Sequence, residues 1–382
     1  MADDTPEISL VVETVSSITY DAEGRPRVVK SAPVKLGGWT SVAIDRSIAR
    51  AADSFAFQYY DIWYPEDKQV VLEPDLICHV DIDGELAIVG WSVATSIKIA
   101  GEDTYILNCE GYSLPGLTYK SSAISKTGQF KNASFKNIVK ELTKNYNFGV
   151  DFDSSLNGEE NETIRSFCID EGEFTINALE RLCRMFGALM TARSNGRLKI
   201  WRTDESKPAD YIFDVKPLEF THVKDFADRC SEYLIVGERP SNATNNGKGS
   251  SGANIVSIVD SNVLTYSPVI VSAEGPGYPK YLDRRAQYEV NVRAGRSEYV
   301  MVKFPGCRDV QGKFIEPGGT VDFSYVPSAS VSKRPIVATQ RMMVESVSTT
   351  LDKDNGLESV ITLVDPKTYS VTPQPPEIKK SK

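Results

Sequence analysis

The sequence predicts a mixed, mainly β protein in which two related β-barrel domains flank an α+β unit. Short alternating strands separated by turn residues fill both ends of the chain, as in barrels and sandwiches, and helical periodicity is concentrated between them. The length of 382 residues also exceeds what one ordinary hydrophobic core needs. The predicted domains are a first barrel over 1–115, an α+β unit over 116–212, a second barrel over 213–365 with a helical segment near 280–297, and a flexible C-terminal arm over 366–382.

The first predicted barrel begins with two strands in the stretch GGWTSVAIDRSIARAADSFAFQYY, residues 37–60. Val42 and Ile44 alternate with polar residues before the segment RSIARAAD, and aromatic residues alternate after it. This period of two predicts that RSIARAAD joins two half-buried strands. Asp83-Gly84 then predicts a tight hairpin between LICHVDI and ELAIVGW, and a second strand pair follows in SVATSIKIA and DTYILNCEG.

The middle unit carries two predicted helices and a hairpin. In NASFKNIVKELTKNY, apolar residues recur at helical spacing after Ser134, which is a suitable N-cap. The second helix is FTINALERLCRMFG, in which Gly187 suits the C-terminal stop. Asn195-Gly196 predicts the turn of a hairpin. We expect the apolar faces of both helices to be core rather than a cofactor site.

Strand patterning returns in the second predicted barrel, with PLEFTHV, EYLIVGE, SEYVMVKF, GGTVDFSYV, QRMMVESVSTT and LESVITLVD. Asn355-Gly356 predicts that the last two form a hairpin. One helix is predicted in YPKYLDRRAQYEVNVRAG. Residues 239–254 are rich in Asn, Ser and Gly and lack an apolar anchor, which predicts a mobile loop. The Pro- and Lys-rich end predicts a disordered or appended arm.

An internal echo links the two predicted barrels. Glu73-Pro74 and Glu316-Pro317 each precede a strand, with an offset of 243 residues. Ser92-Val93 and Ser346-Val347 each begin a strand pair, with an offset of 254 residues. Two related barrels that differ by a loop insertion would explain both offsets. The alternative is that these dipeptides recur by chance in a β-rich sequence.

The composition indicates an ordinary soluble globular protein, with 41% hydrophobic and 25% charged residues. The formal charge of -9 disfavours a large nucleic-acid-binding surface, because release of counterions from phosphates needs clustered Lys and Arg; a local basic patch stays open. No run of 18 apolar residues indicates a transmembrane segment, and the N-terminal MADDTPEISLVVETV is acidic where a secretory signal is basic. We therefore expect the chain to stay in a cytoplasm unless a larger assembly carries it out.

Metal, cofactor and catalytic sites are not expected. The cysteines occur without a C-x-x-C pair, and only His79 and His222 could complete a zinc site, so small buried thiols are the expected state. GKGSSG at 247–252 lacks the positions that a phosphate loop requires, and no Ser or Cys motif accompanies the histidines. A carboxylate pair for glycoside hydrolysis stays open. The cysteines are Cys78, Cys109, Cys168, Cys183, Cys230 and Cys307.

Four segments together resemble the baseplate hub protein of Mu-type contractile phage tails, a family of phages, prophages and tailocins. They are GWTSVAIDRSIARAADSFAF, VVLEPDLICHVDIDGELAIVGW, ALERLCRMFGALMTARSNGRLKIW and RRAQYEVNVRAGRSEYVMVKFPG, followed by a paired-strand end at LVDPKTY. The match spans most of the chain in the right order. EGYSLPGLTYKSSAI departs from the family pattern, which predicts an Asp-Cys-Ser-Ala-like run there.

The resemblance implies a homotrimer with two tube-like barrels per chain, hence six barrels in a pseudo-sixfold ring. Such a ring matches a trimeric membrane-piercing spike to a hexameric tail tube. The implied partners are the central spike and the tail tube or other baseplate proteins, with no cofactor and no specific nucleic-acid binding. The implied location is the virion tail baseplate, assembled in the host bacterial cytoplasm. The alternative function, from another class, is a tail-associated cell-wall hydrolase or a receptor-binding protein.

The implied ring suggests roles for two groups of residues. RSIARAAD would be exposed at a ring interface, where Ala51 and Ala52 allow close approach and Arg46 or Arg50 pairs with a neighbour's carboxylate; a solvated loop with two surface arginines is the alternative. The hole must pass a polyanionic genome or an extended protein without adhesion, so we expect an acidic or neutral lumen. The candidate lumen residues are Asp81, Asp83 and Asp322.

Overall fold

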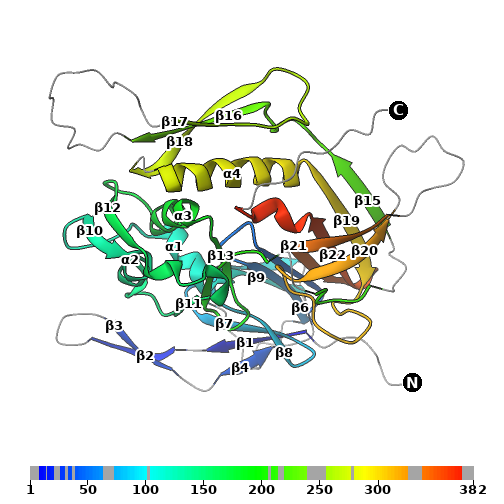
Figure 1. Ribbon diagram of the computed structural model, residues 1–382. Coiled ribbons are helices and arrows are strands. Elements are labelled where there is room, and N and C mark those ends of the chain that lie inside the picture. Colours follow the sequence, from blue (N-terminus) through cyan, green and yellow to red (C-terminus); the bar gives the residue numbers. More distant parts are fainter. Residues whose placement is uncertain are drawn as a thin grey trace, which may run out of the picture.

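The computed structural model is mainly β with few helices (Figure 1). Most strands belong to one large sheet, a helical unit packs against it, and a small sheet packs on two of the helices. The structure describes residues 8–13, 15–20, 26–30, 33–36, 39–62, 73–100, 104–204, 208–213, 219–238, 255–276, 279–325 and 338–371.

The large sheet joins strands of both predicted barrels in the order β15-β19-β22-β21-β5-β6-β9-β8-β7-β1-β4, with β20 paired to β21. Its strands are β1 (Ile8–Glu13), β4 (Val34–Leu36), β5 (Ser41–Ser47), β6 (Ser54–Ile62), β7 (Ile77–Ile82), β8 (Glu85–Ala100), β9 (Thr104–Ser113), β15 (Glu219–Lys224), β19 (Glu298–Pro305), β20 (Thr320–Tyr325), β21 (Ala338–Asp352) and β22 (Gly356–Val364). A short separate hairpin comprises β2 (Val15–Tyr20) and β3 (Pro26–Lys30).

The two halves of the large sheet share one strand order. The first half runs β7-β8-β9-β6-β5 and the second runs β20-β21-β22-β19-β15. If the five strands of each half are numbered in the order of the sequence, both halves have the spatial order 3-4-5-2-1. This shared strand order favours the predicted relation between the two strand-rich segments. Closure of either half into a barrel stays a prediction.

The predicted hairpins are confirmed. Asp83-Gly84 joins β7 to β8, and Asn355-Gly356 lies at the turn between β21 and β22. The sequence divides ELAIVGW from SVATSIKIA, whereas the structure has one long strand, β8, with a bulge between Ser92 and Ala94. A bulge lets one strand bend and continue, so two predicted strands become one.

The predicted α+β unit has its own core, built from α2, α3 and short strands. Ser134 caps α2, because its Oγ accepts the backbone N–H of Asn137 at 3.3 Å. Gly187 ends α3 with a φ of +56°, as predicted for a helix stop. The elements are α1 (Leu117–Lys120), β10 (Gln129–Ser134), α2 (Phe135–Thr143), β11 (Val150–Phe152), β12 (Thr163–Cys168), α3 (Thr175–Phe186), β13 (Leu189–Ala192) and β14 (Leu198–Trp201), with 3-10 helices η1 (Leu114–Gly116), η2 (Ser154–Leu156) and η3 (Glu159–Asn161).

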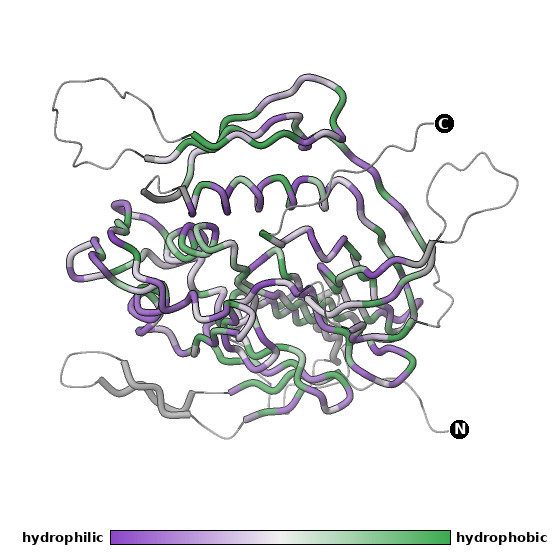
Figure 2. The backbone as a smooth tube through the Cα atoms, viewed as in Figure 1, coloured by the Kyte–Doolittle hydropathy of each residue, from purple (hydrophilic) through white to green (hydrophobic). Residues whose placement is uncertain are grey.

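The predicted helix near the second strand-rich segment is α4 (Pro279–Arg296), which packs between α3 and a small sheet (Figure 1). That sheet contains β16 (Glu232–Glu238), β17 (Ile255–Val259) and β18 (Pro268–Pro276) in the order β17-β16-β18. Figure 2 shows hydrophobic segments along these strands, and those turned towards α4 form a common core with Leu282 and Ala286. The sequence predicts β16 but neither β17 nor β18.

The C-terminal prediction needs a correction. Residues 366–371 belong to the predicted flexible arm, but Pro366–Tyr369 form a 3-10 helix, η4, which packs on α4. Tyr369 is buried there, and the side chain of Asp365 caps the helix by accepting the N–H of Lys367. Residues 372–382 and the predicted mobile loop, 239–254, lie outside the described residues. No helix in the described part of the chain is long and apolar enough to cross a membrane.

Candidate assembly surfaces

The two halves of the large sheet are joined by one strand pair. β5 runs antiparallel to the C-terminal part of β21, from Ser47 opposite Ser346 to Ser41 opposite Asp352. Ile44 lies directly opposite Thr349, and both are only 1% exposed. The halves are thus held together through continuous backbone pairing rather than through side-chain contacts alone.

Buried charges lie at the end of this joint. The guanidinium of Arg46 donates to the carbonyl of Ile315 at 2.7 Å and lies over the ring of Phe314 at 4.4 Å. Burial lowers the pKa of Arg46, and nearby Asp53 opposes that effect. Burial raises the pKa of Asp53 to about 7, although Arg46 opposes it. Arg46 thus finds a carbonyl acceptor and an acidic neighbour inside its own chain, while its Nε is buried without a hydrogen-bond partner.

The connection RSIARAAD lies mostly inside the molecule. Arg46, Ala51 and Ala52 are buried, and the N–H of Ala51 donates to the hydroxyl of Tyr119 at 3.4 Å. The expected exposure is therefore wrong for these three residues, because the connection packs between the sheet and the helical unit. Arg50 is exposed. A contact between this connection and a second chain stays a prediction, and Arg50 is the predicted residue with access to solvent.

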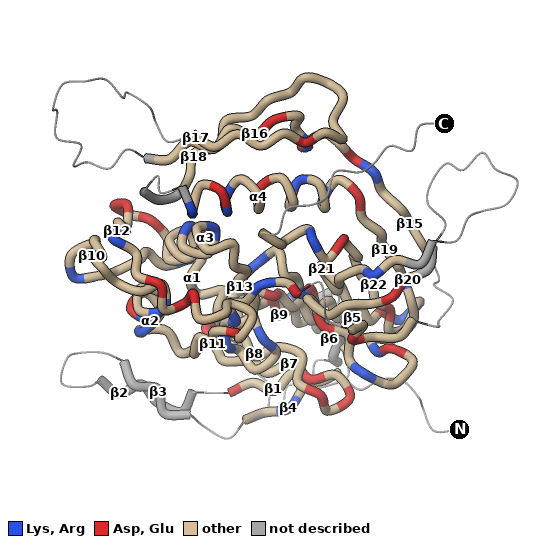
Figure 3. Tube along the Cα trace, viewed as in Figure 1, with Lys and Arg blue, Asp and Glu red and all other residues tan. Residues whose placement is uncertain are grey.

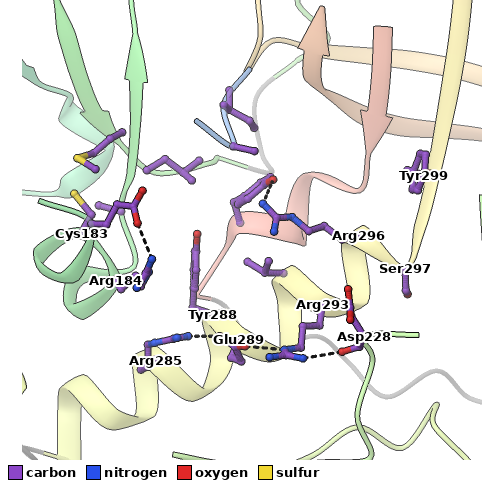
Figure 4. A pocket seen from close by; sticks show the side chains of 18 of the residues that line it. Cys183, Arg184, Asp228, Arg285, Tyr288, Glu289, Arg293, Arg296, Ser297 and Tyr299 are labelled. Atoms are coloured by element: carbon purple, nitrogen blue, oxygen red, sulfur yellow. Dashed lines mark hydrogen bonds and ion pairs between the residues drawn. The ribbon is translucent and has the colours of Figure 1, made fainter. Parts of the chain in front are cut away.

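A cleft of about 680 Å³ lies between α3, α4 and η4 (Figure 4). Its arginines have acidic or phenolic partners within the chain. Arg293 pairs with Glu289 at 2.7 Å, and Arg296 donates to the hydroxyl of Tyr369 at 3.3 Å. The other arginine pairs are Arg184 with Glu180, Arg229 with Asp260, and Arg285 with Glu289. These pairs connect the elements that surround the cleft.

The candidate lumen aspartates occupy equivalent parts of the two halves. Asp81 in β7 and Asp322 in β20 follow core residues by one position, so they lie on the face opposite the core. Asp322 accepts a hydrogen bond from Arg341 at 2.8 Å, which lowers the pKa of Asp322. Asp83, at the β7–β8 turn, lies 4.0 Å from Arg308. Figure 3 shows acidic and basic residues interspersed over these strands. Their place in a lumen stays a prediction.

The expected burial of the thiols holds for Cys78, Cys109, Cys183 and Cys307, whereas Cys168 is exposed and Cys230 is half-buried. His79 lies 3.3 Å from Glu13, and His222 lies 3.0 Å from Glu298, each across neighbouring strands. Burial raises the pKa of Cys78 to about 12 and that of Cys109 to about 11, so these thiols are poor nucleophiles and ligands. Within the described residues, no group of three or more His, Cys, Asp or Glu side chains could hold a metal ion.

Two sheet edges were missed by the sequence reasoning. After Ser92, the bent end of β8 pairs with β9 on one side and with no described strand on the other. This end exposes Ile97 and Ile99, at 58% and 62%. β15 is the terminal strand at the far end of the sheet order. The alternation Ile-Lys-Ile in SIKIA was the sequence signal that could have indicated the β8 edge. An edge strand that exposes two isoleucines is a site where another strand can add.

Comparisons with known proteins identify related phage tail components. The model of the second domain of gp44-like baseplate hub proteins matches residues 118–202, and the model of the N-terminal domain of GpP-like Mu phage baseplate assembly proteins matches residues 33–105. The chain is 25% identical over 353 residues to the baseplate hub protein gp44 of Escherichia phage Mu, which covers 91% of this chain and 87% of that protein.

Solved structures show the same fold. The 43 kDa tail protein of prophage MuSo2 from Shewanella oneidensis has a TM-score of 0.73 at 21% identity, covering 95% of this chain and all of that one. The tail protein from Neisseria meningitidis MC58 has a TM-score of 0.72 at 16% identity, covering 96% and 98%. A type VI secretion component of E. coli, described as similar to T4 phage tail proteins gp27 and gp5, has a TM-score of 0.54 at 9% identity, covering 86% and 73%.

Proposed function

Because this chain is a relative of the baseplate hub proteins of Mu-type phage tails over 91% of its length, we propose that it forms a trimeric, pseudo-hexameric ring that joins the tail tube to the central spike. The role is structural, with no catalytic step. The chain is a component of the virion tail baseplate, and its assembly takes place in the host bacterial cytoplasm. Its domains are 1–115, 116–212 and 213–365.

The duplicated strand order carries this proposal. Each chain contributes two units of one topology, arranged consecutively in a single sheet. Three such chains supply six similar units, which is the number that a hexameric tube presents, while the complete chains repeat three times, as a trimeric spike requires. We further propose that Asp81, Asp83 and Asp322 contribute to an acidic or neutral hole.

Mass and shape measurements test the proposal. Sedimentation and mass measurement of the purified chain should give a trimer, and negative-stain images should give a ring with a central hole. A monomer at every accessible concentration would contradict it. A peptidoglycan clearing assay on the same sample addresses the alternative: reproducible clearing that is lost on changing one side chain would establish a hydrolase instead.

A further inference from the structure

We propose that neighbouring chains of the ring join by antiparallel pairing of β15 of one chain with the bent C-terminal end of β8 of the next. The register is Ala94 opposite Asp225, Ile97 opposite His222, and Ile99 opposite Phe220. This inference rests on the proposed ring, and it names the surfaces and the alignment by which the ring closes.

The hairpins β8–β9 and β21–β22 correspond residue by residue, without an insertion or a deletion. Both hairpins contain a bulge, between Ser92 and Ala94 in one and between Val344 and Ser346 in the other. A constant offset of 252 residues relates the two bulges and also relates the closing pairs, Ala100 with Thr104 and Asp352 with Gly356. The echo of Ser92 with Ser346 is therefore displaced by two residues from the structural equivalence, which is Ser92 with Val344.

The strands before these hairpins are equivalent as well. The N–H of Asp75 donates to the carbonyl of Ser92 at 2.8 Å, and the N–H of Gly318 donates to the carbonyl of Val344 at 2.7 Å. Both donors have positive φ, +70° and +89°. Their offset of 243 residues is the one that relates Glu73-Pro74 to Glu316-Pro317. The two halves therefore share even a left-handed backbone position at the same point.

The remaining equivalence relates the outer strands. β5 pairs with β6 from Ser41 opposite Gln58, and β15 pairs with β19 from Glu219 opposite Lys303. β6 pairs with β9 in the same register as β19 pairs with β22. The strands that pair with β6 and β19, which are β5 and β15, are therefore counterparts, and Phe220 occupies the position of Val42.

The joint inside the chain then serves as a template. In that joint, the end of β21 pairs with β5. The counterparts of these two strands are the end of β8 and β15, which lie towards opposite ends of the same sheet (Figure 1). Their contact repeats the internal joint in a head-to-tail sense, and such contacts close a ring when the rotation permits. Each residue of the internal joint is replaced by its counterpart, which lies 252 residues earlier for β21 and follows from Phe220 at the position of Val42 for β5. This replacement gives the proposed alignment.

The exposure of side chains at the end of β8 favours a second copy of this chain as its partner. Thr349 is 1% exposed in the internal joint, whereas its counterpart Ile97 is 58% exposed. The counterpart of Leu351 is Ile99, also largely exposed, and it would lie opposite the half-buried aromatic ring of Phe220. At the open edge, Ile97 and Phe220 thus take the places of Thr349 and Val42 in the covered joint, whereas His222 takes the place of Ile44.

Charged residues repeat the same arrangement. Lys224 pairs with Glu298 at 2.8 Å on the surface, at the positions that Arg46 and Asp53 occupy in the buried joint. The charge of Glu316 also acts to raise the pKa of Arg46. The counterpart of Glu316 in the first half is the exposed Glu73. In the ring, Lys224 of one chain would therefore approach Glu73 of the next.

Disulfide trapping tests the register. In a Cys168→Ser, Cys230→Ser background, Ser96→Cys with Val223→Cys, or Ile97→Cys with His222→Cys, places thiols on directly opposed positions. One of these adjacent pairs is a non-hydrogen-bonded pair, whose Cα atoms are close enough for a disulfide. Ser96→Cys with Thr221→Cys is the matched control, displaced by two residues. Mild oxidation, denaturing gels without reductant and the mass of the reduced protein are the measurements.

The outcomes separate the register from the ring. We expect linked trimers from at least one in-register pair and at least tenfold less from the control. A trimeric mass with no linkage, or with equal linkage in the control, would overturn the β8–β15 pairing and leave the trimer intact. A monomeric mass with no linkage would overturn both proposals. Linkage limited to dimers at a dimeric mass would overturn the head-to-tail closure.

Discussion

Replacement of Ile99 by Asp should weaken association between chains without unfolding them. Ile99 is 62% exposed in the single chain, and full burial of such a side chain contributes about 1.5–3 kcal/mol, so the contact contributes about 1–2 kcal/mol. A carboxylate facing Phe220 adds a desolvation cost of about 1–3 kcal/mol. Together these effects give about 3 kcal/mol, or roughly a hundredfold weaker contact.

Sedimentation velocity over a concentration series measures this change. Ile99→Leu is the matched control, because Leu351 occupies the counterpart position in the internal joint. Ile124→Asp is a surface control, since Ile124 is 73% exposed elsewhere. Thermal unfolding of the dilute chain should be the same for all three variants. Equal association of the Asp and Leu variants of Ile99 would refute the reasoning.

Three further predictions concern the stability of the chain. Gly295→Ala should cost about 1–3 kcal/mol by overpacking, read as a lower urea midpoint, because its new Cβ would lie 1.9 Å from Thr368 Oγ1; an unchanged midpoint would contradict this. Although burial opposes it, hydrogen bonds from Ser155 and Lys199 lower the pKa of Asp153 from 3.8 to about 2. Asp153→Ala should therefore cost about 1 kcal/mol at neutral pH, allowing for solvent screening, and the difference should shrink as the pH of urea titrations falls from about 4 to about 2; a constant difference would exclude this origin. His79→Gln should change the unfolding free energy by less than about 0.5 kcal/mol, and a larger loss would show that the contact with Glu13 matters.

Local chemistry made the turns and helix ends predictable. Asp83-Gly84 and Asn355-Gly356 specify hairpins within a few residues, and Ser134 and Gly187 specify helix ends in the same way. Such signals act between neighbours in the sequence, so they can be read without knowing the fold.

Non-local pairing was beyond the sequence signals. The pairing of β5 with β21 joins residues about three hundred positions apart, and neither strand specifies its partner. The parallel pairing of β16 with β18 was missed because β18 was not predicted as a strand. The burial of Arg46 follows from that long-range joint, so an arginine that the sequence places on the surface lies in the interior.

Covalent linkage of two equivalent sheet halves affects how a ring would form. The β5–β21 joint is intramolecular, so its two surfaces meet at an effective concentration that does not depend on dilution and reaches the millimolar range for short flexible tethers. In the proposed ring only the β8–β15 contacts require encounters between molecules. Fusion therefore halves the number of concentration-dependent contacts in a six-unit ring, and every unit enters assembly with one neighbour already in register.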